Sequence, residues 1–234
     1  MATLSVIIPV YNEAKTIRSI VDLVRSVDLG DVQKEIIAVD DCSTDGTREA
    51  LHALAADGVR VLLHERNRGK GAALRTGFAA ATGDYLVVQD ADLEYDPHDY
   101  PLLLAPLLAG TADVVYGSRY LGNRPRPVTR FWHSLANRII TLCANMTTNL
   151  ALTDVATCYK AFTKEAMARI LPRLTAERFD IEVDITARVA KERLRLYEVG
   201  VVYVGRSYAD GKKIGVRDGI AFLWAMVKYN WLRS

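Results

Sequence analysis

Short apolar runs alternate with helical segments along the first half of the chain, and this alternation strongly limits the folds open to it. The runs have the length of buried strands and lie at residues 4–9, 35–39, 59–63, 85–88 and 114–117. The segments between them show helical spacing, as at Ile17, Ile20 and Val24. Strands that alternate with helices form right-handed βαβ units around a parallel sheet. We therefore predict an α/β protein with a mostly parallel central sheet flanked by helices.

Polar side chains follow several of these strands at the point where each strand ends. Residues 9–13 follow the first strand, Asp41 follows the second, and Asp90 follows the fourth. Sheets of this kind bind their ligands outside the carboxyl ends of the strands. These side chains are therefore expected to converge in one crevice.

The pair Asp90 and Asp92 is the feature of this crevice that points most directly to chemistry. Residues i and i+2 at the end of a strand share one face, so their carboxylates repel each other unless a positive charge lies between them. A hard divalent cation would supply that charge, and Mg²⁺ or Mn²⁺ bound in this way usually holds substrate phosphates as well. The alternative is an acidic turn that merely ends a strand, and the short motif alone does not decide between the two.

Basic residues gather in the C-terminal half, although the 234-residue chain has a net charge of only +2. Residues 119–150 contain five arginines and no acid, and residues 201–234 contain six basic residues against Asp210 and Asp218. Such a surplus predicts an anionic ligand or a membrane surface, with a plain solvated face as the alternative. The length of the chain predicts one large domain.

Neither the cysteines nor the apolar segments indicate an exported or membrane-spanning chain. Cys42, Cys143 and Cys158 are odd in number and far apart, which suggests neither a metal site nor a disulfide framework and fits a reducing cytosol. No apolar run reaches the length of about 18 residues that a transmembrane helix needs. We therefore expect a cytoplasmic protein that can still contact the cytoplasmic face of a membrane.

Two amphipathic helices are predicted, at residues 128–148 and 216–232. The apolar stripe of the first consists of Phe131, Leu135, Ile139, Leu142 and Met146. Periodicity alone favours a helix that packs this stripe into the core. Basic residues beside Trp and Phe are also typical of a helix at a membrane interface, and the second helix shows the same combination.

Six motifs stand in the order in which they occur in one family of enzymes. They are SVIIPVYNE (residues 5–13), VDDCSTDGT (39–47), NRGKG (67–71), GDYLVVQDADLEYDP (83–97), GSR (117–119) and DGKKI (210–214). With these motifs the chain resembles the family 2 glycosyltransferases of the GT-A fold, a Rossmann-like α/β fold. The last motif, followed by Arg217, Asp218 and Gly219, makes it similar to the dolichol-phosphate mannose synthase group of polyprenyl-phosphate glycosyltransferases.

The resemblance covers nearly the whole chain and implies one GT-A domain. Residues 1–119 would form its nucleotide-binding half, and residues 120–234 its acceptor-binding half, in which residues 128–148 and 216–232 are the candidate membrane-interface helices. Glu94 departs from the family pattern because relatives often carry Gln there. Residues 157–160 depart from it as well, because some relatives carry an acid or an Arg-Gly pair there.

The resemblance also assigns roles to individual positions. The residues implied to hold the nucleoside are Pro9, Tyr11, Glu13, Val39 and Asp41. Those implied to face the diphosphate are Asp90, Ala91 and Asp92, with Asp92 as the direct ligand of Mg²⁺ or Mn²⁺ and Asp90 beside it, close to the sugar or ribose. The cations implied to bind the donor diphosphate or the acceptor phosphate are Arg119, Arg206, Lys212 and Lys213. The implied catalytic set is Asp92, Arg206, Lys212 and Lys213.

The implied reaction is the transfer, with inversion, of a sugar from GDP-mannose or a UDP-sugar to a dolichyl- or undecaprenyl-type phosphate. A phosphate monoester has a second pKa near about 6 and is largely dianionic at neutral pH, so this acceptor hardly needs a general base. A hydroxyl acceptor would need one, and Asp154, Glu182 and Asp184 are then the candidates, although structural roles are favoured for all three. The expected partners are the sugar donor, the lipid acceptor, a membrane surface, and a membrane protein or a second copy of the chain, with no nucleic acid.

Three other functions remain open. A glycosyltransferase of the same fold that acts on a soluble hydroxyl acceptor would share most of these motifs. A nucleotidyltransferase would be expected to show a glycine-rich phosphate loop, which residues 9–13 do not form. A non-catalytic nucleotide-sugar binding module would have no need of both Asp90 and Asp92.

Overall fold

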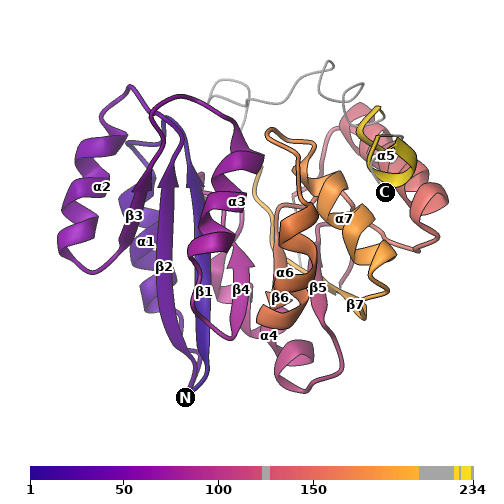
Figure 1. The fold of residues 1–234 in the computed structure, drawn as a ribbon, viewed down its shortest axis with the longest axis horizontal. Coiled ribbons are helices and arrows are strands. Elements are labelled where there is room, and N and C mark those ends of the chain that lie inside the picture. The colour runs from indigo at the N-terminus through magenta and orange to yellow at the C-terminus, as the bar shows by residue number, and fades with distance from the viewer. Residues whose placement is uncertain (123–126, 206–223, 227, 233–234) are drawn as a thin grey trace.

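The computed structural model describes residues 1–122, 127–205, 224–226 and 228–232 (Figure 1). These residues form a seven-stranded sheet with the order β3-β2-β1-β4-β6-β5-β7. Its strands are β1 (Thr3–Val10), β2 (Gln33–Asp40), β3 (Arg60–Leu63), β4 (Tyr85–Val88), β5 (Val114–Ser118), β6 (Lys160–Thr163) and β7 (Leu196–Gly200). Neighbouring strands run parallel except β6, which is antiparallel to β4 and β5. The α/β fold and the mostly parallel sheet predicted from the sequence are confirmed.

Helices cover both faces of this sheet. They are α1 (Ile17–Ser26), α2 (Thr47–Ala56), α3 (Lys70–Ala80), α4 (Tyr100–Leu108), α5 (Phe131–Thr148), α6 (Lys164–Ile170) and α7 (Ile181–Lys191). The short elements η1 (Pro97–Asp99), η2 (Leu171–Arg173) and η4 (Lys228–Leu232) complete the set. Figure 1 shows α3, α6 and α7 on the near face of the sheet, with α1 behind it.

The central strands bury apolar side chains on both of their faces, because helices cover both faces of the sheet. Successive side chains of a strand point to opposite faces. Accordingly, Ile7 of β1 packs in the core under α3, α6 and α7, whereas Val6 and Ile8 pack in the core under α1, α2 and α4. Continuous apolar runs of this kind are typical of parallel sheets, which explains why the strands were readable from the sequence.

The antiparallel strand β6 has a direct consequence for the site. It lies between β4 and β5, so its amino end is at the same edge of the sheet as their carboxyl ends. Lys160 opens β6, and Cys158 precedes it. The segment that departs from the family pattern therefore lies beside Asp90, which follows β4.

The core-helix interpretation of residues 128–148 is wrong. The exposed fractions are 68% for Phe131, 76% for Trp132, 48% for Ile139, 59% for Leu142 and 77% for Met146, so much of the apolar stripe faces outward. The buried residues of α5 are instead Asn137, Thr141 and Ala144. Periodicity identified the apolar face, but polar contacts with residues 152–155 decide which face turns inward.

Only part of the second predicted amphipathic helix lies within the described residues. Residues 224–226 are helical, with Met226 buried and Trp224 61% exposed. Tyr229 of η4 is fully buried, and its phenol donates a hydrogen bond to Asp180 over 2.6 Å. Within the part of the chain that the structure describes, no helix is long and apolar enough to cross a membrane.

Candidate active site

A cavity of about 410 Å³ opens at the carboxyl edge of the sheet. The predicted donor-site residues that line it are Pro9, Tyr11, Glu13, Asp41, Asp90, Ala91, Asp92 and Arg119. The polar strand ends therefore meet in one crevice, as expected from the strand order. Val39 is different, because its side chain is fully buried in the core and does not line this donor cavity.

Asp41 anchors the turn that leads into α3. Its carboxylate accepts hydrogen bonds from the backbone N–H of Arg68 over 2.8 Å and of Gly69 over 2.6 Å, and His64 Nδ1 lies 2.8 Å from the same group. The turn then packs against residues 176–178, because Ala72 donates its N–H to the carbonyl of Glu177 over 3.0 Å. This contact brings Arg178 to the wall of the donor cavity.

Lys70 pairs with Asp90. Its ammonium lies 2.7 Å from Asp90 Oδ1 and 2.9 Å from Cys158 Sγ. Burial alone would lower the pKa of Lys70, but the charges around it, first that of Asp90, raise this pKa well above its usual value. Burial likewise opposes ionisation of Asp90, and the charge of Lys70 nevertheless lowers its pKa. The pair is therefore ionised, and Lys70 neutralises Asp90.

The surroundings of Asp92 disfavour the charge of its carboxylate. Burial, together with the charges of Asp90 and Glu94, raises the pKa of Asp92 to about 7. A cation beside Asp92 would relieve the repulsion. Within the described residues no three His, Cys, Asp or Glu side chains gather into a metal site. A carboxylate such as that of Asp92 would suit a Mg²⁺ or Mn²⁺ ion that takes further ligands from substrate phosphates and water.

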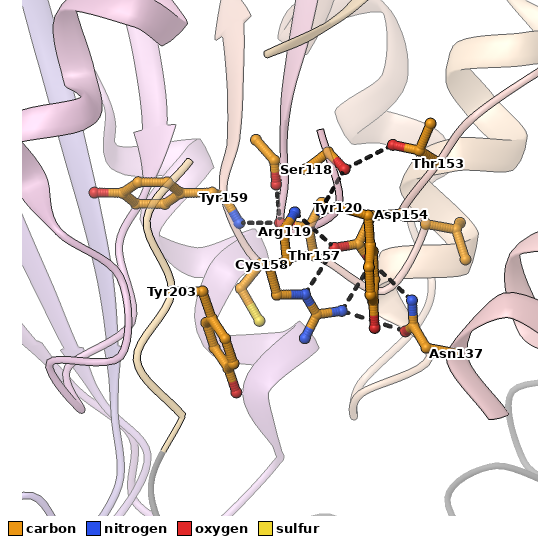
Figure 2. A network of polar contacts seen from close by, with 12 residues as sticks. Ser118, Arg119, Tyr120, Asn137, Thr153, Asp154, Thr157, Cys158, Tyr159 and Tyr203 are labelled. Atoms are coloured by element: carbon orange, nitrogen blue, oxygen red, sulfur yellow. Dashed lines mark hydrogen bonds and ion pairs between the residues drawn. The ribbon is translucent and has the colours of Figure 1, made fainter. Parts of the chain in front are cut away.

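Arg119 also lines the donor cavity, and polar contacts with Asp154 and Asn137 hold its guanidinium (Figure 2). Its Nε donates to Asp154 Oδ2 over 2.7 Å, and its Nη2 donates to Asp154 Oδ1 over 2.8 Å. The Tyr203 ring lies 5.1 Å from the guanidinium carbon. Burial opposes the charge of Asp154, but the charge and hydrogen bonds of Arg119 hold the pKa of that carboxyl below its ordinary value.

A second cavity of about 190 Å³ adjoins the first. Both are lined by Arg119, His133 and Tyr203. The second is also lined by Val128 and Thr129, which precede α5. The two cavities therefore share a wall formed by Arg119, His133 and Tyr203, and the second extends to the residues that precede α5.

The three acids considered as general bases all have charged partners. Asp154 pairs with Arg119, and Asp184 Oδ1 lies 3.2 Å from Arg188 Nε. Glu182 pairs with Lys160. These contacts support the structural roles favoured by the sequence.

The predicted site residues and the residues that line the donor cavity overlap only in part. Arg206, Lys212 and Lys213 lie outside the described residues, so their roles stay predictions. The unpredicted lining residues include Tyr95, His133, Arg178, Phe179 and Tyr203. Tyr203 follows β7, so the expectation that ligands bind beyond the carboxyl ends of the strands could have identified it. Arg178 and His133 reach the cavity only through packing between segments distant in the sequence.

Comparison with known proteins matches the chain to one enzyme family. The model of the family described as "Glycosyl transferase family 2" matches residues 5–171. An undecaprenyl-phosphate mannosyltransferase of Micrococcus luteus is 30% identical over 218 residues, which are 89% of this chain and 86% of that protein. A dolichol-phosphate mannosyltransferase of Mycosarcoma maydis is 30% identical over 221 residues, which are 89% of this chain and 74% of that protein.

Among solved structures, the fold is similar to that of glucosyl-3-phosphoglycerate synthase of Mycobacterium tuberculosis. In its complex with Mn²⁺, UDP-glucose and phosphoglyceric acid, that enzyme superposes with a TM-score of 0.74 at 23% identity, covering 99% of this chain and 79% of that one. This likeness confirms the expected GT-A fold. The match of the family model and the two relatives at 30% identity show that the chain is a glycosyltransferase and belongs to glycosyl transferase family 2.

Proposed function

We propose that this glycosyltransferase transfers one sugar, with inversion, from a nucleotide-diphosphate sugar to a polyprenyl phosphate at the cytoplasmic face of a membrane. The observation that carries the proposal is the second cavity, which shares Arg119 with the donor cavity and is lined by residues that directly precede the exposed apolar face of α5. The two mannosyltransferase relatives, which are named for undecaprenyl and dolichol phosphates, support it.

The donor would lie in the cavity that contains Asp41, Asp90 and Asp92, with GDP-mannose and UDP-sugars as the candidate donors. Mg²⁺ or Mn²⁺ held by Asp92, with Asp90 beside it, would supply Lewis-acid stabilisation of the leaving diphosphate. Lys70 balances the charge of Asp90, so this carboxylate repels the anionic donor less.

The acceptor would reach the donor sugar through the second cavity. There Arg119 presents a charged guanidinium that Asp154 holds in one orientation, and the planar fork of arginine matches phosphate oxygens. An oxygen of the acceptor phosphate attacks the anomeric carbon, and the bond from that carbon to the nucleoside diphosphate breaks with its electron pair on the departing oxygen. The acceptor is already dianionic, so no protein base is required, in agreement with the pairing of Asp154, Glu182 and Asp184.

The polyprenyl chain would extend along α5 into lipid. The outward face of this helix exposes Phe131, Trp132, Leu142 and Met146, and residues 119–150 contain no acid that would repel an anionic membrane. A basic, aromatic-rich helix with an unburied apolar face is typical of a peripheral membrane contact. Exposed Arg138 on the same helix adds attraction for phospholipid headgroups.

The test is nucleotide release with Mn²⁺ across a panel of GDP- and UDP-sugars, each with and without a polyprenyl phosphate in detergent. Release that depends on the lipid supports the proposal and identifies the donor at the same time. Nucleotide release that does not change with the lipid but increases with a soluble sugar or with 3-phosphoglycerate would contradict the proposal and support the soluble-acceptor function. Release of pyrophosphate from a nucleoside triphosphate would indicate a nucleotidyltransferase instead.

A further inference from the structure

A row of four alternating charges runs from the donor cavity into the core. Its members, in order from the cavity inward, are Asp90, Lys70, Glu182 and Lys160. Only Asp90 and Lys70 line the cavity. Glu182 of α7 and Lys160 of β6 lie behind them, where no substrate reaches.

The side chain of Lys160 lies in the interior of the protein. This side chain is 0% exposed, and its ammonium contacts Glu182 and the Thr157 carbonyl and lies 4.6 Å from the centre of the Tyr116 ring. Burying an ammonium group is costly unless a charged partner compensates for it. A methionine would fill similar space without that cost, so packing alone does not explain a lysine here.

Glu182 shares its two oxygens unequally between the neighbouring lysines. One oxygen, Oε2, contacts Lys160. The other, Oε1, is buried without a hydrogen-bond partner among the described residues and lies 3.7 Å from the Lys70 ammonium. Lys70 therefore stands between two carboxylates, bonded to Asp90 at 2.7 Å and only approached by Glu182.

We propose that Lys160 is a positioning residue of the donor site: by neutralising Glu182 from behind, it leaves the Lys70 ammonium to Asp90. Without Lys160, the full charge of Glu182 would draw Lys70 across a gap of about one ångström and away from Asp90. Asp90 would then present a carboxylate without its counter-ion to the anionic donor. This inference rests on the donor role of Asp90 in the proposed function, and it does not depend on which acceptor the enzyme uses.

The experiment compares Lys160→Met, Glu182→Gln and the double variant. Binding of GDP-mannose and of UDP-glucose is measured by calorimetry with MnCl₂ and without any acceptor. Lys160→Met is expected to weaken donor binding by about tenfold, because contacting charges in one network are coupled. Adding Glu182→Gln removes the pull on Lys70 and is expected to restore binding close to that of the wild type.

A purely structural role for Lys160 predicts a different result. The reductions in donor affinity caused by the two single substitutions would then be independent. A double variant whose affinity is reduced by the product of the two single reductions would overturn the proposal. Asp113→Asn is the matched control, since Asp113 forms an ion pair with Arg195 over 2.7 Å but does not line the donor cavity. It should leave donor binding unchanged.

A second measurement does not need the donor to be known. A crystal structure of the ligand-free Lys160→Met variant is expected to show the Lys70 ammonium bonded to Glu182. Lys70 still bonded to Asp90 would overturn the proposal even if the enzyme proved to use another donor or acceptor. If Lys160→Met fails to fold, the double variant, which has no buried charge at either position, serves for the binding comparison. Weak donor binding by that variant would count against the proposal.

Discussion

Asp154 holds the Arg119 guanidinium through both of its carboxylate oxygens, at 2.7 and 2.8 Å (Figure 2). Asn137 of α5 joins the pair, because its Nδ2 donates to Asp154 Oδ1 over 3.1 Å and its Oδ1 accepts from Arg119 Nη2 over 3.3 Å. The arginine shared by the two cavities is thereby tied to the inner face of the helix whose outer face is apolar and exposed. Donor site and proposed membrane contact are parts of one rigid arrangement.

Asp154→Asn should strongly destabilise the protein. It leaves Arg119 buried without its charge partner, and breaking a buried ion pair costs about 3 kcal/mol or more. Urea unfolding measures the loss. Asp113→Asn, which breaks a largely exposed pair with Arg195, should cost no more than about 1 kcal/mol. Equal losses in the two variants would contradict the structural role of Asp154.

The ion pair of Arg119 and Asp154 should also make the stability of the protein depend on pH. Arg119 holds the pKa of Asp154 below its ordinary value of 3.8, so the unfolded state binds the proton more readily than the folded state. The stabilisation is therefore fully present well above pH 3.8 and is lost as the pH falls through the lower pKa of the folded state. The difference in unfolding free energy between wild type and Asp154→Asn should shrink on acidification below about pH 4. A difference that stays constant down to pH 2 would argue against this linkage.

Asp92→Asn should abolish metal-dependent turnover while the fold survives. The substitution removes the proposed metal ligand, and it also removes a buried charge that Asp90 and Glu94 repel, so the thermal midpoint without metal should stay the same or rise. Nucleotide release titrated with Mn²⁺ and a thermal melt together check both parts. Glu94→Gln is the control at the next acidic position and should keep its dependence on Mn²⁺. Full turnover by Asp92→Asn would remove Asp92 from the metal site.

Gly69→Ala should disturb the turn that supports the donor cavity. Gly69 has a φ of +95°, and a Cβ there would lie 2.5 Å from the carbonyl oxygen of Glu177. Gly30→Ala is the matched control, because Gly30 has a φ of +59° but no atom within 4 Å of the added carbon. The control should lose about 1 kcal/mol from the left-handed backbone alone. Gly69→Ala should lose clearly more and should also bind the donor more weakly, which melting and calorimetry would detect.

The outward face of α5 should control binding to membranes. Leu142→Glu with Met146→Glu places two charges on that face, away from the residues that line either cavity. This variant should fail to float with liposomes that contain anionic phospholipid, yet it should bind nucleotide sugar normally. Leu108→Glu changes a 50% exposed leucine on α4 and should float like the wild type. Flotation of the α5 variant with unchanged efficiency would exclude this face as the lipid contact.

The sequence by itself determined the sheet and the composition of the crevice, because both follow from local patterns. Buried parallel strands must be apolar along their length, and the polar residues of a parallel sheet meet where its strands end. The convergence of Asp41, Asp90 and Asp92 could therefore be predicted from their places along the chain. The family motifs added the enzyme class, because their order carries more information than any one of them.

Only the tertiary structure decided which neighbour each group has. The periodicity of α5 shows which residues share a face, but polar contacts from Asn137 and Thr141 turn that face outward. Likewise, Lys70 becomes the counter-ion of Asp90 because the start of α3 lies beside the end of β4. Charge pairing and burial depend on distances between segments that are far apart in the sequence, and no local pattern records those distances.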